Sequence, residues 1–192
     1  MSDFRAVCQA RPVTVPEAKL ERTEAGTRAV GDGWFVLNAR DAVWSHHEHF
    51  GEAARFKGDE PFPEIGFYVR VLRKGQPMAH YHGEDAQEDF LVVRGECLLL
   101  IEGEERTLKA WDFVHCPAWT EHVLIGAGDE PAVVIAVGDR GREGIRYPRS
   151  ELALKHRAGA EEETTVPDES YAKVGRLKNA PRGPYREGDL PD

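Results

Sequence analysis

Apolar and polar residues alternate over short runs through the middle of the chain, which is the pattern of half-buried β-strands. In residues 65–72 the odd-numbered positions are apolar and share one face, whereas Tyr68 and Arg70 lie on the other face. Turn residues separate further short runs at 33–38, 89–93, 97–102, 106–108, 112–116, 121–125 and 131–137. No helical pattern interrupts this series, so the sequence predicts an antiparallel all-β sandwich or barrel.

The two ends of the chain lack this alternation. Residues 1–32 carry scattered Arg, Glu, Pro and Gly and predict an irregular N-terminal arm, which leaves residues 33–140 as the barrel. Residues 141–192 are polar and charged, with one short helix expected at 150–157 behind a Ser150 cap. The rest of this C-terminal extension is either a tail that wraps the barrel or a partner subunit, or a solvated tail.

Composition narrows the class of protein and its partners. With 192 residues and 41% hydrophobic content, the chain suits one domain with a real core. A net charge of −9 argues against nucleic acid or an anionic membrane as the main partner. We expect a cytoplasmic protein, because no apolar run approaches the roughly 18 residues of a membrane helix and the start lacks a signal-peptide core. Cys8, Cys97 and Cys116 form no CxxC pair, which suits a reducing compartment, and Cys97 is expected to be buried.

Three potential metal ligands lie close together in the sequence after residue 75. If His80 and His82 stand on a strand, both imidazoles leave the same face because they are two residues apart. Glu88 follows the polar loop 83–87 and starts the returning strand. A hairpin there would bring the carboxylate back beside the two histidines.

A second histidine cluster, formed by His46, His47 and His49, precedes this region. Histidine-rich tracts can bind metal. No apolar frame fixes the geometry of this one, however, and an exposed polar loop is the expected structure.

The potential metal ligands after residue 75, taken with residues from the second half of the barrel, resemble the two motifs of the cupin family, in its small single-domain cupin-2 form. The first motif, with its HxH, glutamate and glycines, is matched by Gly75, His80, His82, Glu88 and Gly95. The second motif, a proline followed five residues later by histidine, is matched by Pro117 and His122, with Asp112 ahead of them. The match covers residues 65–138.

Two tryptophans depart from the family pattern. Trp111 and Trp119 stand where the family usually has glycine. Glycine commonly supplies a positive φ in such a turn, and tryptophan has a steric cost there. We therefore expect the loop before His122 to differ in shape.

The resemblance implies a double-stranded β-helix, or jelly-roll barrel, that holds a metal ion through His80, His82, Glu88 and His122. Three imidazoles and one carboxylate suit Fe(II), Mn(II), Ni(II), Co(II), Cu(II) or Zn(II). Four protein ligands leave up to two octahedral positions open for substrate or dioxygen.

The cupin fold hosts unrelated activities, so two classes of function stay open. The first is a metal-dependent enzyme acting on a small organic molecule, with an oxygenase placed before an isomerase or lyase. The second is a non-enzymatic module that binds a small molecule or a metal. A transcription regulator is disfavoured, because the sequence has no helix-turn-helix segment or basic stripe. We also expect a homodimer, since sheet edges need cover and the long arms can supply it.

A substrate pocket has four candidate residues, Tyr68, Arg70, Phe113 and Trp119. Aromatic residues in a small barrel are more often simple core than pocket wall. Arg70 would orient an anionic substrate if its face turns inward, and is a solvated surface residue otherwise. His115 and Cys116 lie on opposite strand faces, so only one of them can point inward.

Overall fold

Short antiparallel strands are the main secondary structure of this computed structural model, which describes residues 14–57 and 61–191. Cys8 lies outside these residues. In chain order the strands are β1 Lys19–Thr23, β2 Gly26–Val30, β3 Trp44–His47, β4 Gly51–Arg55, β5 Ile65–Leu72, β6 Gly83–Glu84, β7 Glu88–Arg94, β8 Glu96–Ile101, β9 Glu104–Lys109, β10 Phe113–Cys116, β11 His122–Gly126, β12 Ala132–Asp139, β13 Ile145–Arg146 and β14 Arg182–Gly183. The helices are α1 Glu151–Lys155 and α2 Pro167–Ser170, and the 3-10 turns are η1 Ala39–Asp41 and η2 Leu177–Asn179.

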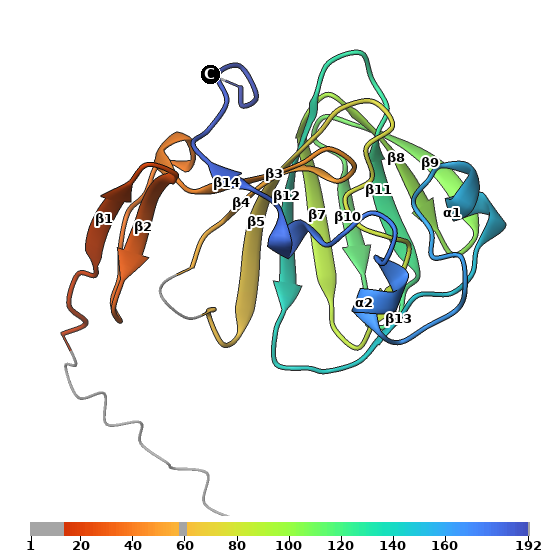
Figure 1. The fold of residues 1–192 in the computed structure, drawn as a ribbon, viewed down its shortest axis with the longest axis horizontal. Coiled ribbons are helices and arrows are strands. Elements are labelled where there is room, and N and C mark those ends of the chain that lie inside the picture. The colour runs from red at the N-terminus through yellow and green to blue at the C-terminus, as the bar shows by residue number, and fades with distance from the viewer. Residues whose placement is uncertain (1–13, 58–60, 192) are drawn as a thin grey trace, which may run out of the picture.

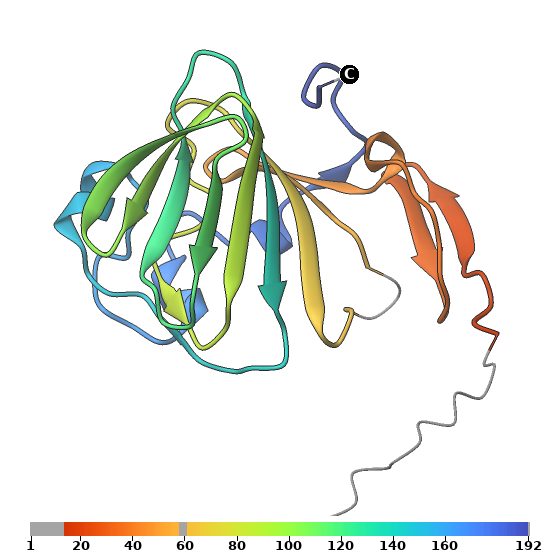
Figure 2. The ribbon, with the colours of Figure 1, turned by 180° about the vertical axis from the view of Figure 1, so that it is seen from behind.

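Two antiparallel sheets enclose the core of the barrel (Figures 1 and 2). The larger sheet runs in the order β10-β7-β12-β5-β4-β3-β14, and the smaller one in the order β11-β8-β9. Apolar side chains from both sheets meet between them, among them Phe90 and Val134 from the larger sheet and Leu99 and Leu124 from the smaller one. The predicted antiparallel all-β fold is confirmed.

Strand β5 follows the alternation that its sequence predicts. Leu72 and Tyr68 pack into the core between the sheets, whereas Val69 and Val71 pack against Trp44 on the opposite side. Arg70 shares the inward face with Tyr68 and is only 7% exposed. The interpretation of Arg70 as a solvated surface residue is therefore wrong.

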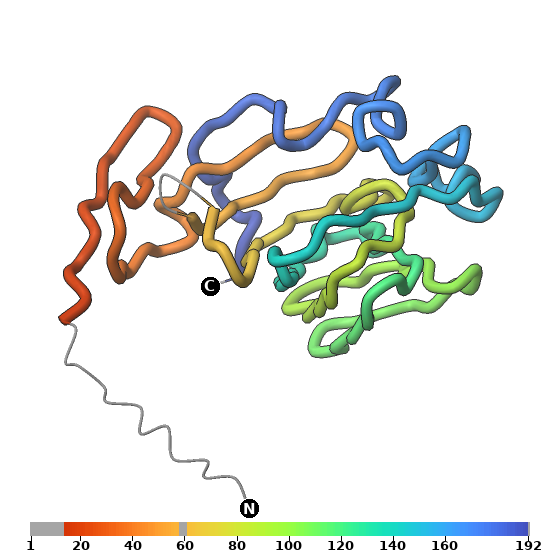
Figure 3. The backbone as a smooth tube through the Cα atoms, turned by 90° about the horizontal axis from the view of Figure 1, so that it is seen from below, coloured from red at the N-terminus to blue at the C-terminus, as the bar shows by residue number. Residues whose placement is uncertain are grey.

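The N-terminal region differs from its sequence prediction in two places. Residues 33–38, expected as a strand, form a single bridge between Trp34 and Glu17. No neighbouring strand pairs with the rest of this segment in the described structure, and Val36 is 79% exposed. Residues 19–30, expected as irregular chain, instead pair as the hairpin β1–β2. Its turn is closed by the Thr23 hydroxyl, which donates to the carbonyl of Gly26, and the hairpin projects from one side of the barrel in every view (Figures 1 to 3).

The C-terminal extension wraps the barrel. The expected helix forms as α1, with the Ser150 hydroxyl accepting a hydrogen bond from the backbone N–H of Ala153. Beyond α2 the chain crosses in front of β12 and β7 in Figure 1 and runs along β3 and β4 in Figure 3, where β14 pairs with β3. Tyr171, Val174 and Leu177 pack on Phe50 there, so the interpretation as a solvated tail is wrong. Among the described residues, no helix is long and apolar enough to cross a membrane.

Candidate metal site

Three of the four expected ligands meet at one end of the barrel core. His82 ends the segment before β6 and forms a backbone bridge with His122, which begins β11. Glu88 begins β7. The Oε2 atom of Glu88 lies 3.1 Å from Nε2 of His122 and 3.7 Å from Nε2 of His82. One donor atom from each residue lies within 4.8 Å of the other two, so a single ion can reach all three.

Backbone carbonyls fix which nitrogen of each histidine faces this point. Nδ1 of His82 lies 2.6 Å from the carbonyl oxygen of His80, and Nδ1 of His122 lies 3.0 Å from that of Thr120. A carbonyl only accepts hydrogen bonds, so each Nδ1 carries its proton. Each Nε2 therefore has a lone pair directed at Glu88 when the ring is neutral, which is how metal-ligating histidines are held.

Two of the three donor atoms are buried and poorly satisfied by the protein itself. The side chain of His122 is 2% exposed and that of Glu88 is 19% exposed. Neither Nε2 of His122 nor Oε2 of Glu88 has a well-directed hydrogen bond within the described structure. Buried polar atoms are nearly always hydrogen-bonded, and such an orphaned pair fits a cation that accepts both lone pairs.

Burial and close approach perturb the pKa values of the cluster. Burial and the neighbouring His122 ring lower the pKa of His82. Burial also opposes the charged form of His122, but Cys116 and Glu88 outweigh it and raise the His122 pKa to about 10. Burial would raise the pKa of Glu88, but contact with His122 and His82 lowers it instead. Without a metal, His122 therefore carries a proton on Nε2 as well as on Nδ1 and forms an ion pair with the Glu88 carboxylate, and a bound cation would replace the Nε2 proton.

Sequence reasoning missed a second carboxyl group in the cluster, that of Glu84. Burial and the charge of Glu88 raise the pKa of Glu84 to about 7. The sequence predicts a polar loop over residues 83–87, but Glu84 lies in β6, two residues beyond His82. The same two-residue alternation that was applied to His80 and His82 would have placed it beside the ligands.

Cys116 also borders the site. It is buried, pairs in register with Glu88 across β10 and β7, and contacts His122. His115 points the other way and pairs with Asp89 at 2.7 Å, so only one of the two neighbours faces inward, as predicted. Cys97 is buried as expected, and burial raises its pKa to about 12.

His80 does not join the other three. The segment from Met78 to Tyr81 has no strand pairing, so the prediction that His80 and His82 share a strand face is wrong. Nδ1 of His80 lies 3.0 Å from the Ser170 hydroxyl, and its ring stacks on Tyr171 at a centroid distance of 4.5 Å. Both partners come from the C-terminal extension, which gives His80 a structural role in holding that extension.

The second histidine cluster belongs to the β3–β4 hairpin and not to an exposed loop. His46 lies 3.1 Å from the carboxylate of Glu52 and is largely buried. Nδ1 of His47 accepts hydrogen bonds from the backbone of His49 and Phe50 and so shapes the hairpin turn. The expectation of an exposed loop is wrong, because β3 pairs with β4 on one side and with β14 on the other.

The aromatic pocket candidates lie in different places. Phe113 is 64% exposed on the outer face of β10, because Val114 and Cys116 occupy the inner face. Tyr68 packs in the core and accepts a hydrogen bond from Arg140 at 2.7 Å. The structure therefore does not gather them into one apolar wall.

Trp119 takes the backbone conformation of the glycine that it replaces. Its φ is 69° and that of Trp111 is 75°, both in the left-handed region that side chains disfavour. The N–H of Trp119 donates to the carbonyl of Glu84 at 2.7 Å, and its indole lies against Gly144. The loop before His122 thus keeps a glycine-like shape and bears a half-exposed indole.

A family model for the cupin domain matches residues 67–138, the segment that carries β5, all three donors and β12. This segment is a cupin domain. Its two motifs meet as the sequence resemblance implied, because β7 and β11 bring Glu88 and His122 to the same end of the barrel. No curated protein matches the chain.

Solved structures similar to this cupin include three from bacteria. A candidate sugar phosphate isomerase from Acidithiobacillus ferrooxidans is 22% identical, with a TM-score of 0.40 over 43% of this chain and 54% of its own. A predicted oxalate decarboxylase from Thermotoga maritima is 18% identical, with a TM-score of 0.49 over 55% of this chain and 98% of its own. KdgF from Halomonas sp. is 21% identical, with a TM-score of 0.47 over 58% of this chain and 96% of its own. The chain thus spans about half the length of the first of these.

Proposed function

We propose that this cupin is a metal-dependent enzyme that acts on a small organic molecule, with a divalent transition metal held by His82, Glu88 and His122. The observation that carries the proposal is the convergence of two Nε2 atoms and one carboxylate oxygen within 4.8 Å of one another. The carbonyl contacts at both Nδ1 atoms support it, since they leave the converging nitrogens free to bind.

Leaving His80 out changes the expected ligand set. Two histidines and one carboxylate with open positions form the donor set typical of non-haem Fe(II) oxygenases. Mn, Ni, Co, Cu and Zn also accept these donors. We therefore keep an oxygenase first and an isomerase or lyase next, with the bound ion supplying Lewis acidity or a site for dioxygen.

The protein's own residues prepare the site for a cation. The carbonyls of His80 and Thr120 orient the rings, and Glu88 supplies the negative charge. The ring of Tyr147 lies 5.7 Å from that of His82 and limits the space on that side. The proton on His122 must leave before the ring can act as a ligand, so binding of the ion and loss of this proton are coupled.

A non-enzymatic metal- or ligand-binding module is the alternative. The depth of the donors favours it, since deeply buried ligands also suit a structural ion. Turnover discriminates the two. The test is to reconstitute purified protein with Fe(II) and to screen catechols, thiols and enols in an oxygen electrode. Substrate-dependent oxygen consumption is expected only if the protein is an oxygenase.

Metal analysis tests the site itself. Wild type is expected to retain about one equivalent of metal after purification and desalting, whereas H82A and H122Q retain none. H115A is the matched control, because His115 is surface-exposed and paired with Asp89. Equal metal content in H82A and wild type would refute the site.

We further propose that the protein is a homodimer. Edge strand β10 exposes Phe113, and the neighbouring Trp111 is 74% exposed, so this edge offers apolar surface to a second copy. Light scattering tests this, and a monomeric mass at micromolar concentration would contradict it.

A further inference from the structure

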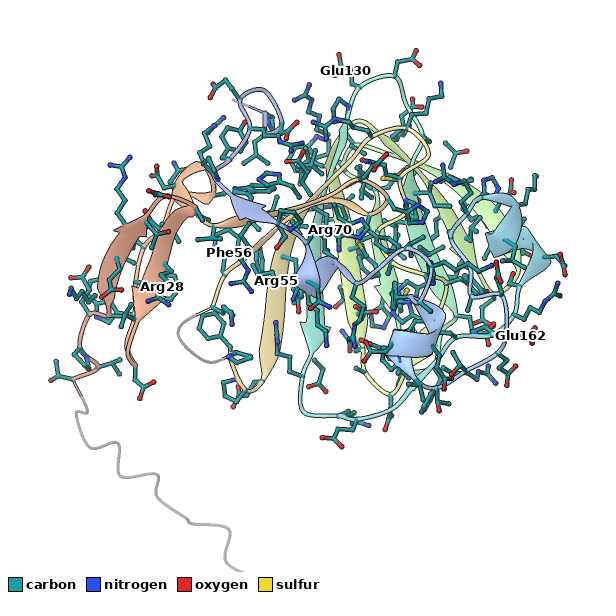
Figure 4. All side chains as sticks on the ribbon, viewed as in Figure 1. Arg28, Arg55, Phe56, Arg70, Glu130 and Glu162 are labelled. Carbon is teal, nitrogen blue, oxygen red and sulfur yellow. The ribbon has the colours of Figure 1, made fainter. Side chains whose placement is uncertain are left out.

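A cavity of about 210 Å³ lies between the barrel and the C-terminal extension. Arg55 and Arg70 reach it from β4 and β5, and Tyr171, Arg176 and Lys178 reach it from the extension. Figure 4 labels Arg55 and Arg70, which lie beside the blue ribbon of the extension. The extension that wraps the barrel therefore also closes one side of this cavity.

The lining of the cavity is strongly basic. It carries three guanidinium groups and one ammonium group, and none of the described residues around it is acidic. Burial and the neighbouring guanidinium groups of Arg140, Arg182 and Arg176 lower the pKa of Arg55. Arg176 pairs with Asp168 at 2.8 Å, outside the lining, whereas the described structure gives Lys178 no carboxylate partner.

Arg70 is the residue that points to a ligand. It is 93% buried, and its Nη2 donates to the carbonyls of Phe50 and Met78 at 2.9 and 2.6 Å. Its Nε has no hydrogen-bond partner within the described residues. A buried guanidinium without a carboxylate is costly, because the lost hydration is not replaced by an opposite charge.

We propose that this cavity binds the oxyanion of a small molecule, a carboxylate or a phosphate group, with Arg70 at its base and Arg55 and Lys178 at its sides. A planar guanidinium presents N–H donors in a fork that matches such groups, and an ammonium adds charge without a fixed direction. The volume suits one compact anionic group with a short carbon chain. The anion would supply the negatively charged partner that Arg70 lacks.

The position of the cavity connects it to the proposed metal site. Tyr147 and Tyr171 line the cavity on one side. On the other, the Tyr147 ring lies 5.7 Å from His82, and the Tyr171 ring stacks on His80. If the proposed function holds, on which this step rests, the substrate is an organic acid or phosphate ester whose anionic end lies here.

Calorimetric titration of the metal-free protein with inorganic phosphate, and separately with acetate, tests the anion site. Saturable binding is expected at constant ionic strength, and the tighter of the two anions identifies the preferred group. K178A and R55A are each expected to weaken binding about fivefold or more, because each removes a charge that faces the anion. K74A is the matched control, since it also removes one positive charge but Lys74 pairs with Asp129 elsewhere.

If the role of Arg70 is only structural, phosphate and acetate should show no saturable binding. The two carbonyl contacts of Arg70 tie the β3–β4 turn to the segment before His80, and R70K would report on that clamp. K178A and R55A leave the clamp intact, so they test the anion site without unfolding the protein. Absence of saturation, or equal binding by K178A, R55A and K74A, would overturn the proposal.

Metal and anion binding can fail separately. H122Q is expected to lose metal and keep phosphate binding, since His122 does not line the cavity. Phosphate binding without any metal uptake by wild type would refute the proposed function and leave the anion site standing. Metal uptake without phosphate or acetate binding would refute the anion site and leave the proposed metal site standing.

Discussion

Nε2 of His122 lies 3.1 Å from Oε2 of Glu88, and neither atom has a well-directed hydrogen bond in the described structure. The two residues come from different strands, β11 and β7, that belong to opposite sheets. Only closure of the barrel brings them together. This pair is therefore the part of the site that depends most directly on the fold.

Glu88→Gln is expected to weaken metal binding by about 100-fold or more, because it removes the one negative charge among the three donors while keeping the shape of the side chain. Competition with a chromophoric chelator measures the affinity. Glu105→Gln, on the surface beside His156, is the control and should bind metal like wild type. Unchanged affinity in Glu88→Gln would mean that this carboxylate is not a ligand.

His80→Ala should keep the metal and lose stability. The variant removes the stacking on Tyr171 and the contact with Ser170, which together stabilise the attachment of the extension by about 1–2 kcal/mol. Urea unfolding and metal analysis of the same sample report both quantities. Loss of metal with unchanged stability would instead make His80 a fourth ligand.

His80 also marks the limit of what could be predicted from the sequence. The alternation in residues 65–72 follows from period-two patterning, and the meeting of Glu88 with His122 was implied by the resemblance of the two motifs to the cupin family. The direction of His80 depends on an unpaired segment and on Tyr171, some ninety residues later, and no local pattern encodes that contact. The hairpin β1–β2 was missed for the related reason that its strands carry little apolar alternation.

Metal uptake should release about one proton per ion near neutral pH. The His122 pKa is raised to about 10, so this ring is charged at pH 7 and must lose its proton to bind. The apparent affinity is expected to rise about tenfold per pH unit until the pH approaches 10. Calorimetry in buffers of different ionisation enthalpy counts the protons, and zero release would contradict this assignment.

The same shift predicts how the stability of the metal-free protein depends on pH. The folded pKa of His122 lies above its ordinary value of 6.5, so its contribution is full below pH 6.5 and is lost as the pH rises through 10. H122Q should therefore be destabilised more at pH 6 than at pH 10, relative to wild type. Urea unfolding at both pH values checks this, and an equal difference would contradict it.

Trp119→Gly should be more stable than Trp119→Ala by about 1 kcal/mol. Both variants lose the packing of the indole on Gly144, but only glycine relieves the strain of a φ of 69°. Comparison of the two variants cancels the packing loss. Equal stability would mean that the loop relaxes once the indole is gone.

Anomalous diffraction from crystals of wild type loaded with Fe(II) or Mn(II) tests the central claim most directly. We expect one anomalous peak at about 2.0–2.2 Å from Nε2 of His82, Nε2 of His122 and a carboxylate oxygen of Glu88. His80 should remain stacked on Tyr171 and make no bond to the ion. A peak elsewhere, or no peak among these three residues in metal-loaded crystals, would contradict the account.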